Sequence, residues 1–154
     1  MKSRHRAREV AFQILYRIDL ELHSSGTPAP TGEALLSELV HHFDHFKVPE
    51  ELREFAASLV VGTITTLVDL DQAIEKHAAK WKVSRMAMVD RNLMRMALYE
   101  LRHFPDIPPS VTLDEAVELS KQFGEEDTPA FVNGILDAIV KSGEKDGKAK
   151  TAES

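Results

Sequence analysis

The chain has 154 residues, no cysteine and a formal net charge of −6. A chain of this length buries a sizeable hydrophobic core without disulfides or metal ions. The lack of cysteine excludes disulfide frameworks, thiolate zinc sites and thiol nucleophiles. The amino terminus is polar, and no run reaches the roughly 18 apolar residues that a membrane span requires. We therefore expect a soluble, cytoplasmic protein that binds no membrane.

Positive charge gathers at the amino terminus. The first 17 residues hold five Lys or Arg side chains and one Glu, a net +4, so the other residues together carry −10. Arg4, Arg6 and Arg8 would lie near a helix start, where cations are unfavourable and acidic residues are the normal choice. This placement favours contact with phosphate groups, such as those of a nucleic acid. The alternative is a solvated leader whose charge has no function.

Helical periodicity dominates the whole chain, and no segment shows the alternation of a strand, so the predicted fold class is all-α. In the first half, the predicted helices span about residues 3–22, 31–46 and 49–81. Pro49 suits the first turn of the third helix, and its apolar stripe continues without a break to Trp81. The sequence therefore predicts one long central helix, in which Gly62 costs about 1 kcal/mol or allows a close helix crossing.

The second half contains three more predicted helices. After a turn at residues 84–87, Asp90 can cap a helix that ends near Leu101. Thr112 and Glu115 form a capping-box pattern at the start of a helix that ends before Gly124, which suits a left-handed helix end.

The last helix should run from Thr128, followed by a proline, to about Lys141. Residues 142–154 contain no apolar side chain that could favour ordering, which predicts a flexible tail after a folded domain of residues 1–141.

A row of arginines follows one face of the predicted helix after Asp90. Arg91, Arg95 and Arg102 lie within about 40° of one another at 3.6 residues per turn, and Tyr99 lies beside them. Single-stranded RNA is bound by such a combination, because guanidinium groups take phosphates and an aromatic ring stacks a base. The alternative is an ordinary surface row paired with carboxylates such as Glu100 or Asp90, which spacing alone favours.

Other patterns do not support a catalytic or metal site. His41 and His45 lie one helical turn apart, but spacing supplies no third ligand. No phosphate-cradling loop or nucleophile elbow is present, so we expect no enzyme activity and no cofactor. Asn133 and Gly134 are poor helix formers inside the last helix. Gly134 would allow close packing, and Asn133 would satisfy backbone groups or reach a ligand.

Four segments together resemble the NusB family of bacterial transcription factors. They are RAREVAFQILY near the amino terminus, LMRMALYEL in the middle, and VTLDEAVELSKQFG followed by FVNGILD near the carboxy terminus. The resemblance covers about residues 3–140. It implies an all-helical fold of two small three-helix bundles, arranged around the long central helix that the sequence predicts.

The resemblance also implies a function in transcription antitermination. NusB proteins bind the boxA element of nascent RNA, notably ribosomal RNA leaders, as a heterodimer with the ribosomal protein NusE. With other Nus factors, that complex modifies elongation by RNA polymerase. Some members of the family self-associate, so the choice between monomer and homodimer stays open.

The family's site residues are carried over to this sequence one position at a time. The positions expected to contact RNA are Arg4, Arg6, Arg8, Tyr16, Arg95, Asp127 and Phe131. The positions expected near the NusE partner are Asp90, Leu93 and Glu100. Many members have a lysine just before the phenylalanine, whereas this chain has Ala130, so one phosphate contact would be missing.

Two other classes of function remain as alternatives. The first is the NusB-like domain found at the front of some ribosomal RNA cytosine methyltransferases, which would need a catalytic domain that this sequence does not show. The second is a pure interaction protein, either a monomer or a homodimer, in which the arginines are ordinary surface.

Overall fold

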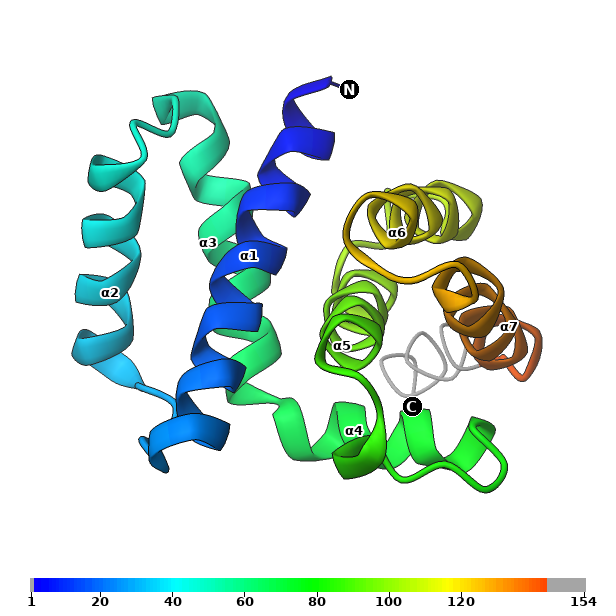
Figure 1. Ribbon diagram of the computed structural model, residues 1–154. Helices are drawn as coiled ribbons and strands as arrows, with labels where there is room; N and C mark the ends of the chain where they lie inside the picture. Colours follow the sequence, from blue (N-terminus) through cyan, green and yellow to red (C-terminus); the bar gives the residue numbers. More distant parts are fainter. Residues whose placement is uncertain (1, 144–154) are drawn as a thin grey trace, which may run out of the picture. The chain divides into compact units, whose positions relative to one another are not determined.

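The structure of the protein is a computed structural model that describes residues 2–143. All regular structure within this range is helical, with no strand, which confirms the all-α fold class. The helices are α1 (Lys2–Ser25), α2 (Gly32–His45), α3 (Glu50–Thr65), α4 (Leu67–His77), the short 3-10 helix η1 (Val83–Arg85), α5 (Met88–His103), α6 (Pro109–Phe123) and α7 (Thr128–Lys141) (Figure 1). The expected tail lies outside the described residues from position 144 onward.

The chain divides between Thr66 and Leu67 into two compact units. The first unit contains α1, α2 and α3, in agreement with a small three-helix bundle, and α1 lies across α3 (Figure 1). Arg53 on α3 secures the connection from α2: its Nε donates to the carbonyl of Val48 at 2.9 Å, and its Nη1 donates to Asp44 Oδ1 at 2.9 Å.

The long central helix was predicted wrongly, because the chain breaks at Thr66 between α3 and α4. The hydroxyls of Thr65 and Thr66 donate to the carbonyls of Val61 and Gly62 at 2.8 and 2.7 Å. Such bonds compete with the backbone ladder and bend helices, and the β-branched side chains disfavour the helix further. The apolar stripe continues across the break because each helix buries its own face.

The second unit therefore holds four α-helices, α4 to α7, rather than the expected three. Its core is formed by apolar side chains from all four, among them Ile74, Leu98, Ala116 and Leu136. Helix α5 is the most enclosed, with ten of its 16 residues buried. It begins after Ala87, so Asp90 lies within its first turn and is not the cap that the sequence predicted.

Two predicted helix boundaries around α6 also differ from the structure. Thr112 lies inside α6, which begins at Pro109, and its hydroxyl donates to the buried carboxylate of Glu100 at 2.6 Å instead of capping the helix. Gly124 has extended backbone angles, φ −101° and ψ −170°, rather than a left-handed conformation. Its small size is needed instead, because a Cβ there would lie 2.6 Å from the Thr128 side chain.

No single helix among the described residues is long and apolar enough to cross a membrane. Only α3 and α4, taken together across their break, meet the length and composition criteria.

The two glycines near α7 should respond in opposite directions to substitution by alanine. Gly124→Ala should lower the melting temperature, because the new methyl group collides with Thr128. Gly134→Ala should stabilise the protein by about 0.5–1 kcal/mol, because its site inside α7 has no neighbour within 4 Å and alanine favours the helix. Thermal and urea denaturation of both variants check this. A Gly124→Ala variant with the same melting temperature as the parent protein would contradict the assigned role of that glycine.

Candidate nucleic-acid interface

The arginines at the start of α1 are arranged around one aromatic ring of α3. The guanidinium carbon of Arg4 lies 4.7 Å from the ring centroid of Phe55, and that of Arg8 lies 5.4 Å from it. Such cation–π contacts are worth about 0.5–1 kcal/mol at exposed sites. They give these two arginines a structural function that offsets the unfavourable position near a helix start, and the spacing of the sequence alone does not reveal it.

The three arginines differ in how much of the side chain solvent can reach. Arg8 is only 4% exposed, so it is a packing residue in this structure and presents little surface to a ligand. Arg4 is exposed, and the Arg6 side chain is 61% exposed with a loose ion pair of 3.8 Å to Glu9. Arg4 and Arg6 therefore form the accessible cationic end of α1.

Tyr16 lies two turns further along α1 and is half-buried. Its ring centroid is 6.1 Å from that of Phe12, whose side chain is buried in the core of the first unit. This contact holds the phenol ring while part of it stays accessible, which is the arrangement that base stacking needs.

The expected arginine row on α5 is not an exposed surface. Arg91 and Arg95 are 2% and 8% exposed, and only Arg102 is partly exposed. The Arg95 guanidinium binds both carboxylate oxygens of Asp71 on α4, at 2.7 and 2.8 Å, and a third bond of 3.3 Å reaches Asn92 Oδ1. Spacing placed these arginines on one face correctly, but that face points into the second unit.

The expected partner residues on α5 also differ in how much of their surface is accessible. Leu93 is 0% exposed and Glu100 is 1% exposed, with its carboxylate bonded to Thr112. Asp90 is half-buried and is the one of the three with accessible surface. The expectation that Leu93 and Glu100 offer surface to a partner is therefore not met by the structure.

Asp90 connects the start of α5 to the start of α7. The Thr128 hydroxyl hydrogen-bonds to the Asp90 carboxylate. The oxygen of that hydroxyl also accepts the backbone N–H of Glu125 at 2.9 Å. Burial raises the pKa of Asp90, the Thr128 bond lowers it, and the nearby carboxylate of Asp127 raises it. Two expected site residues, Asp90 and Asp127, are thus brought together.

Phe131 lies one turn into α7 and is half-buried. Its ring meets that of Trp81 edge to face, with centroids 5.8 Å apart and planes at 78°. Trp81 follows α4 and is 53% exposed. Its helical spacing predicts Trp81 only as the end of an apolar stripe, whereas the structure places it at the surface.

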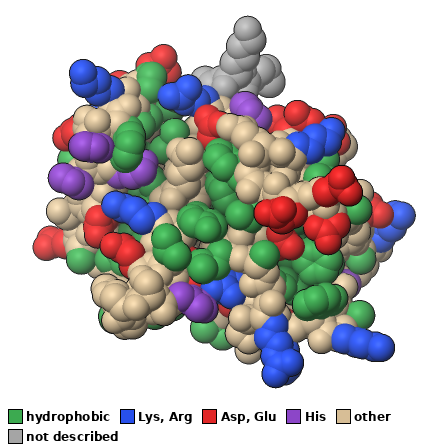
Figure 2. All heavy atoms as spheres, viewed as in Figure 1, with side chains coloured by type: hydrophobic (Ala, Val, Ile, Leu, Met, Phe, Trp, Pro, Cys, Tyr) green, Lys and Arg blue, Asp and Glu red, His purple; other side chains and the backbone are tan. Residues whose placement is uncertain are grey.

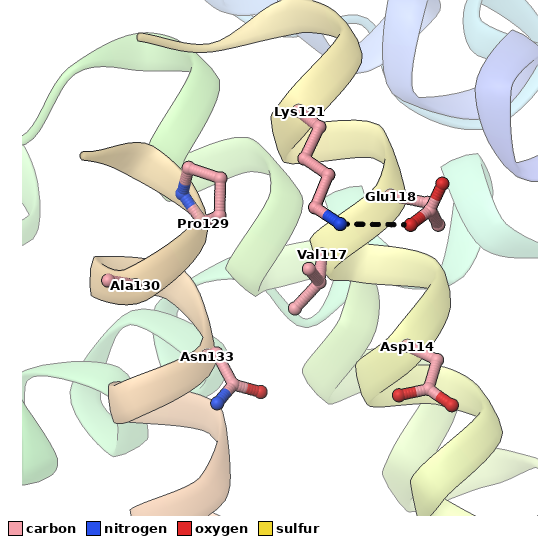
Figure 3. A pocket seen from close by; sticks show the side chains of 7 residues that line it. All are labelled: Asp114, Val117, Glu118, Lys121, Pro129, Ala130 and Asn133. Atoms are coloured by element: carbon pink, nitrogen blue, oxygen red, sulfur yellow. Dashed lines mark hydrogen bonds and ion pairs between the residues drawn. The ribbon is translucent and has the colours of Figure 1, made fainter. Parts of the chain in front are cut away.

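An open groove lies between α6 and α7 beside Ala130 (Figure 3). Its lining residues are Asp114, Val117, Glu118, Lys121, Pro129, Ala130 and Asn133. Lys121 is the one cation among them, and it pairs with Glu118 at 3.4 Å. Two carboxylates and one neutralised lysine do not favour phosphate, so the groove is no substitute for the contact that the lysine expected before Phe131 would make.

Charged side chains on the face shown in Figure 2 are scattered, with cations interspersed among carboxylates, while histidines gather over α2. The rings of His41 and His45 are stacked with centroids 6.3 Å apart. Within the described part of the chain, no three His, Asp or Glu side chains are placed to hold a metal ion.

Comparison with known proteins identifies relatives over nearly the whole chain. The transcription antitermination protein NusB of Geotalea uraniireducens is 41% identical over 145 residues, which are 91% of this chain and 95% of that protein. The protein of the same name from Desulfitobacterium hafniense is 42% identical over 142 residues, 91% of this chain and 89% of its own length.

Solved structures agree with this relationship. T. maritima NusB is 33% identical and superimposes with a TM-score of 0.78 over 94% of this chain and 96% of that one. A crystal structure of the antitermination factors NusB and NusE in complex with double-stranded RNA contains a chain that is 29% identical, with a TM-score of 0.77 over 92% of this chain and 98% of that one. The sequence model of the NusB family matches residues 5–141, and the chain belongs to that family.

Proposed function

We propose that this chain is a transcription antitermination factor that catalyses no reaction. It binds boxA-type RNA in nascent ribosomal RNA transcripts together with a NusE-type protein, and the complex modifies elongation by RNA polymerase with other Nus factors. The observation that carries this proposal is the match, over 92% of this chain, to a protein crystallised with NusE and RNA. The site of action is the cytoplasm.

The proposed RNA surface consists of the accessible expected residues on each unit. On α1 these are Arg4, Arg6 and Tyr16, two cations and a partly exposed aromatic ring. On the second unit they are Asp127 and Phe131, at the start of α7. Arg8 and Arg95 support the surface indirectly, because both are buried and one is held by a bidentate ion pair.

The proposed partner surface is centred on Asp90. Burial raises the pKa of the Asp90 carboxyl group. The ionised carboxylate therefore lowers the stability of the folded protein. Ionisable groups whose pKa is perturbed cluster at functional sites. A NusE-type partner that carries a cation could pair with Asp90, whereas Leu93 and Glu100 lack accessible surface and act through packing.

The alternatives are less well supported. The curated relatives are named antitermination proteins, and the chain spans 95% and 89% of the two described above. Neither of the two is named a methyltransferase. The interaction-only alternative predicts that the chain does not bind RNA. Titration with RNA distinguishes it from the proposed function.

Removing the accessible cations of α1 should weaken RNA binding. Arg4→Gln/Arg6→Gln should lower affinity for a boxA-type oligonucleotide and reduce the salt slope by about 0.7 for each phosphate group that the variant no longer neutralises. Arg8 is left in place because it is buried. Titrations at several salt concentrations check this, with Lys47→Gln, an exposed cation at the end of α2, as a control. An unchanged slope for the double variant would show that these arginines are ordinary surface.

Replacing Asp90 should separate stability from partner binding. Since its pKa is raised in the folded state, the ionised carboxylate opposes folding near neutral pH, and this cost disappears as pH falls toward the ordinary pKa of aspartate. Asp90→Asn should therefore raise the melting temperature at about pH 7, and the difference should narrow on acidification. Asparagine can still accept the Thr128 bond.

The same variant should weaken binding of the NusE-type partner if Asp90 contacts it. Calorimetric titration of the partner into parent and Asp90→Asn protein measures this. A variant that is more stable but binds the partner equally well would remove Asp90 from the partner surface.

A further inference from the structure

A second cationic segment follows α4, far in sequence from the basic amino terminus. Residues 76–89 hold four Lys or Arg side chains and no carboxylate, in a chain whose net charge is −6. Lys80, Lys82 and Arg85 are all exposed. Within residues 2–143, no ion pair neutralises any of these three, in contrast to Lys121 and Lys141, which pair with carboxylates on their own helices at 3.4 and 3.0 Å.

Trp81 lies between the two lysines and is the only tryptophan of the chain. More than half of its surface is accessible, at 53%. Its ring packs edge to face on Phe131, a residue of the proposed RNA surface. A large aromatic side chain so exposed is unusual for a residue whose only role is packing.

The backbone around Trp81 is held firmly. Ala79 adopts a left-handed conformation, φ 55°, that ends α4, and the N–H of Trp81 donates to the carbonyl of Ala78 at 3.0 Å. The Val83 N–H donates to Glu75 Oε2 at 2.7 Å.

The buried Arg91 holds the part of this segment that follows Trp81. Its Nη1 lies 3.3 to 3.4 Å from the carbonyls of Val83, Ser84 and Met86. The indole is thus presented on an anchored segment rather than on a free loop, which lowers the entropy cost of stacking.

We propose that Trp81 stacks an unpaired RNA base while Lys80, Lys82 and Arg85 contact the phosphates on either side, which extends the RNA surface from Phe131 toward η1. This inference rests on the proposed RNA-binding function. Aromatic rings with flanking cations are the combination that binds single strands. Protein interfaces are depleted in lysine, so the lysines on both sides of the ring favour RNA over a protein partner.

The sole tryptophan makes the test direct. A single-stranded boxA-type RNA of about 12 nucleotides is titrated into the full chain, with and without the NusE-type partner, while Trp81 fluorescence is recorded. Stacking should quench the emission, and the quenching should saturate at the concentration at which RNA binding saturates. A fluorescence signal that follows only addition of the partner, and not of RNA, would assign Trp81 to the protein interface and overturn the inference.

Two sets of variants test the same surface without fluorescence. Trp81→Ala should weaken RNA binding about 5-fold or more, as expected when one base can no longer stack, while Trp81→Phe should retain most of the affinity. Lys80→Gln/Lys82→Gln should reduce the salt slope by about 1.4. Lys121→Gln/Lys141→Gln, with the same change in net charge, should leave the slope unchanged.

Melting curves confirm that each variant is folded, and the lysine variants keep the test valid if Trp81→Ala is unstable. Parent protein that binds RNA with no quenching, together with an unchanged slope for Lys80→Gln/Lys82→Gln, overturns this inference alone. Parent protein that binds no RNA in either condition overturns the proposed function, and this inference with it.

Discussion

The second unit depends on burying the charged groups of α5. An isolated buried charge is strongly unfavourable, so each one must find partners with good geometry. Arg95 forms an ion pair with Asp71 on α4, and Glu100 accepts a hydrogen bond from Thr112 on α6. Arg91 donates to carbonyls around η1. Each bond ties α5 to a different neighbour. The bonds of Arg91 also hold in place the segment that follows Trp81. Buried polar groups that favour one arrangement over others are a recognised route to a unique fold.

Charge imposes a second constraint, on function. A chain with net charge −6 repels a polyanion on average, and nine of its 19 Lys and Arg side chains lie in the first 17 residues and in residues 76–89. A protein that makes only a few phosphate contacts binds RNA with modest affinity, and that affinity depends strongly on salt. The buried Arg8 and Arg95, which sequence reasoning included among the RNA contacts, reduce the number of free cations further. A protein partner that adds its own phosphate contacts would overcome this limitation.

Periodicity was enough to predict the helices and the all-α fold, because an amphipathic stripe is a property of the sequence itself. It could not predict the break at Thr66, where hydroxyl groups compete for carbonyls while the apolar stripe runs on. Spacing correctly grouped Arg91 and Arg95 on one face, but only tertiary packing decides that this face is buried. Gly124 was recognised as a helix end for the wrong reason, since the steric demand comes from Thr128. Trp81 was missed because an aromatic residue at helical spacing is normally part of the core.

RNA and a NusE-type partner should bind this chain cooperatively. Linkage requires that the partner tighten RNA binding by the same factor by which RNA tightens the protein pair, and coupling of about 1–3 kcal/mol, or 5- to 150-fold, is usual. The measurement is the affinity of this chain for boxA-type RNA, with and without a saturating NusE-type protein, at one fixed salt concentration. We predict tighter RNA binding within that range when the partner is present, and equal affinity in the two conditions would contradict the adaptor function.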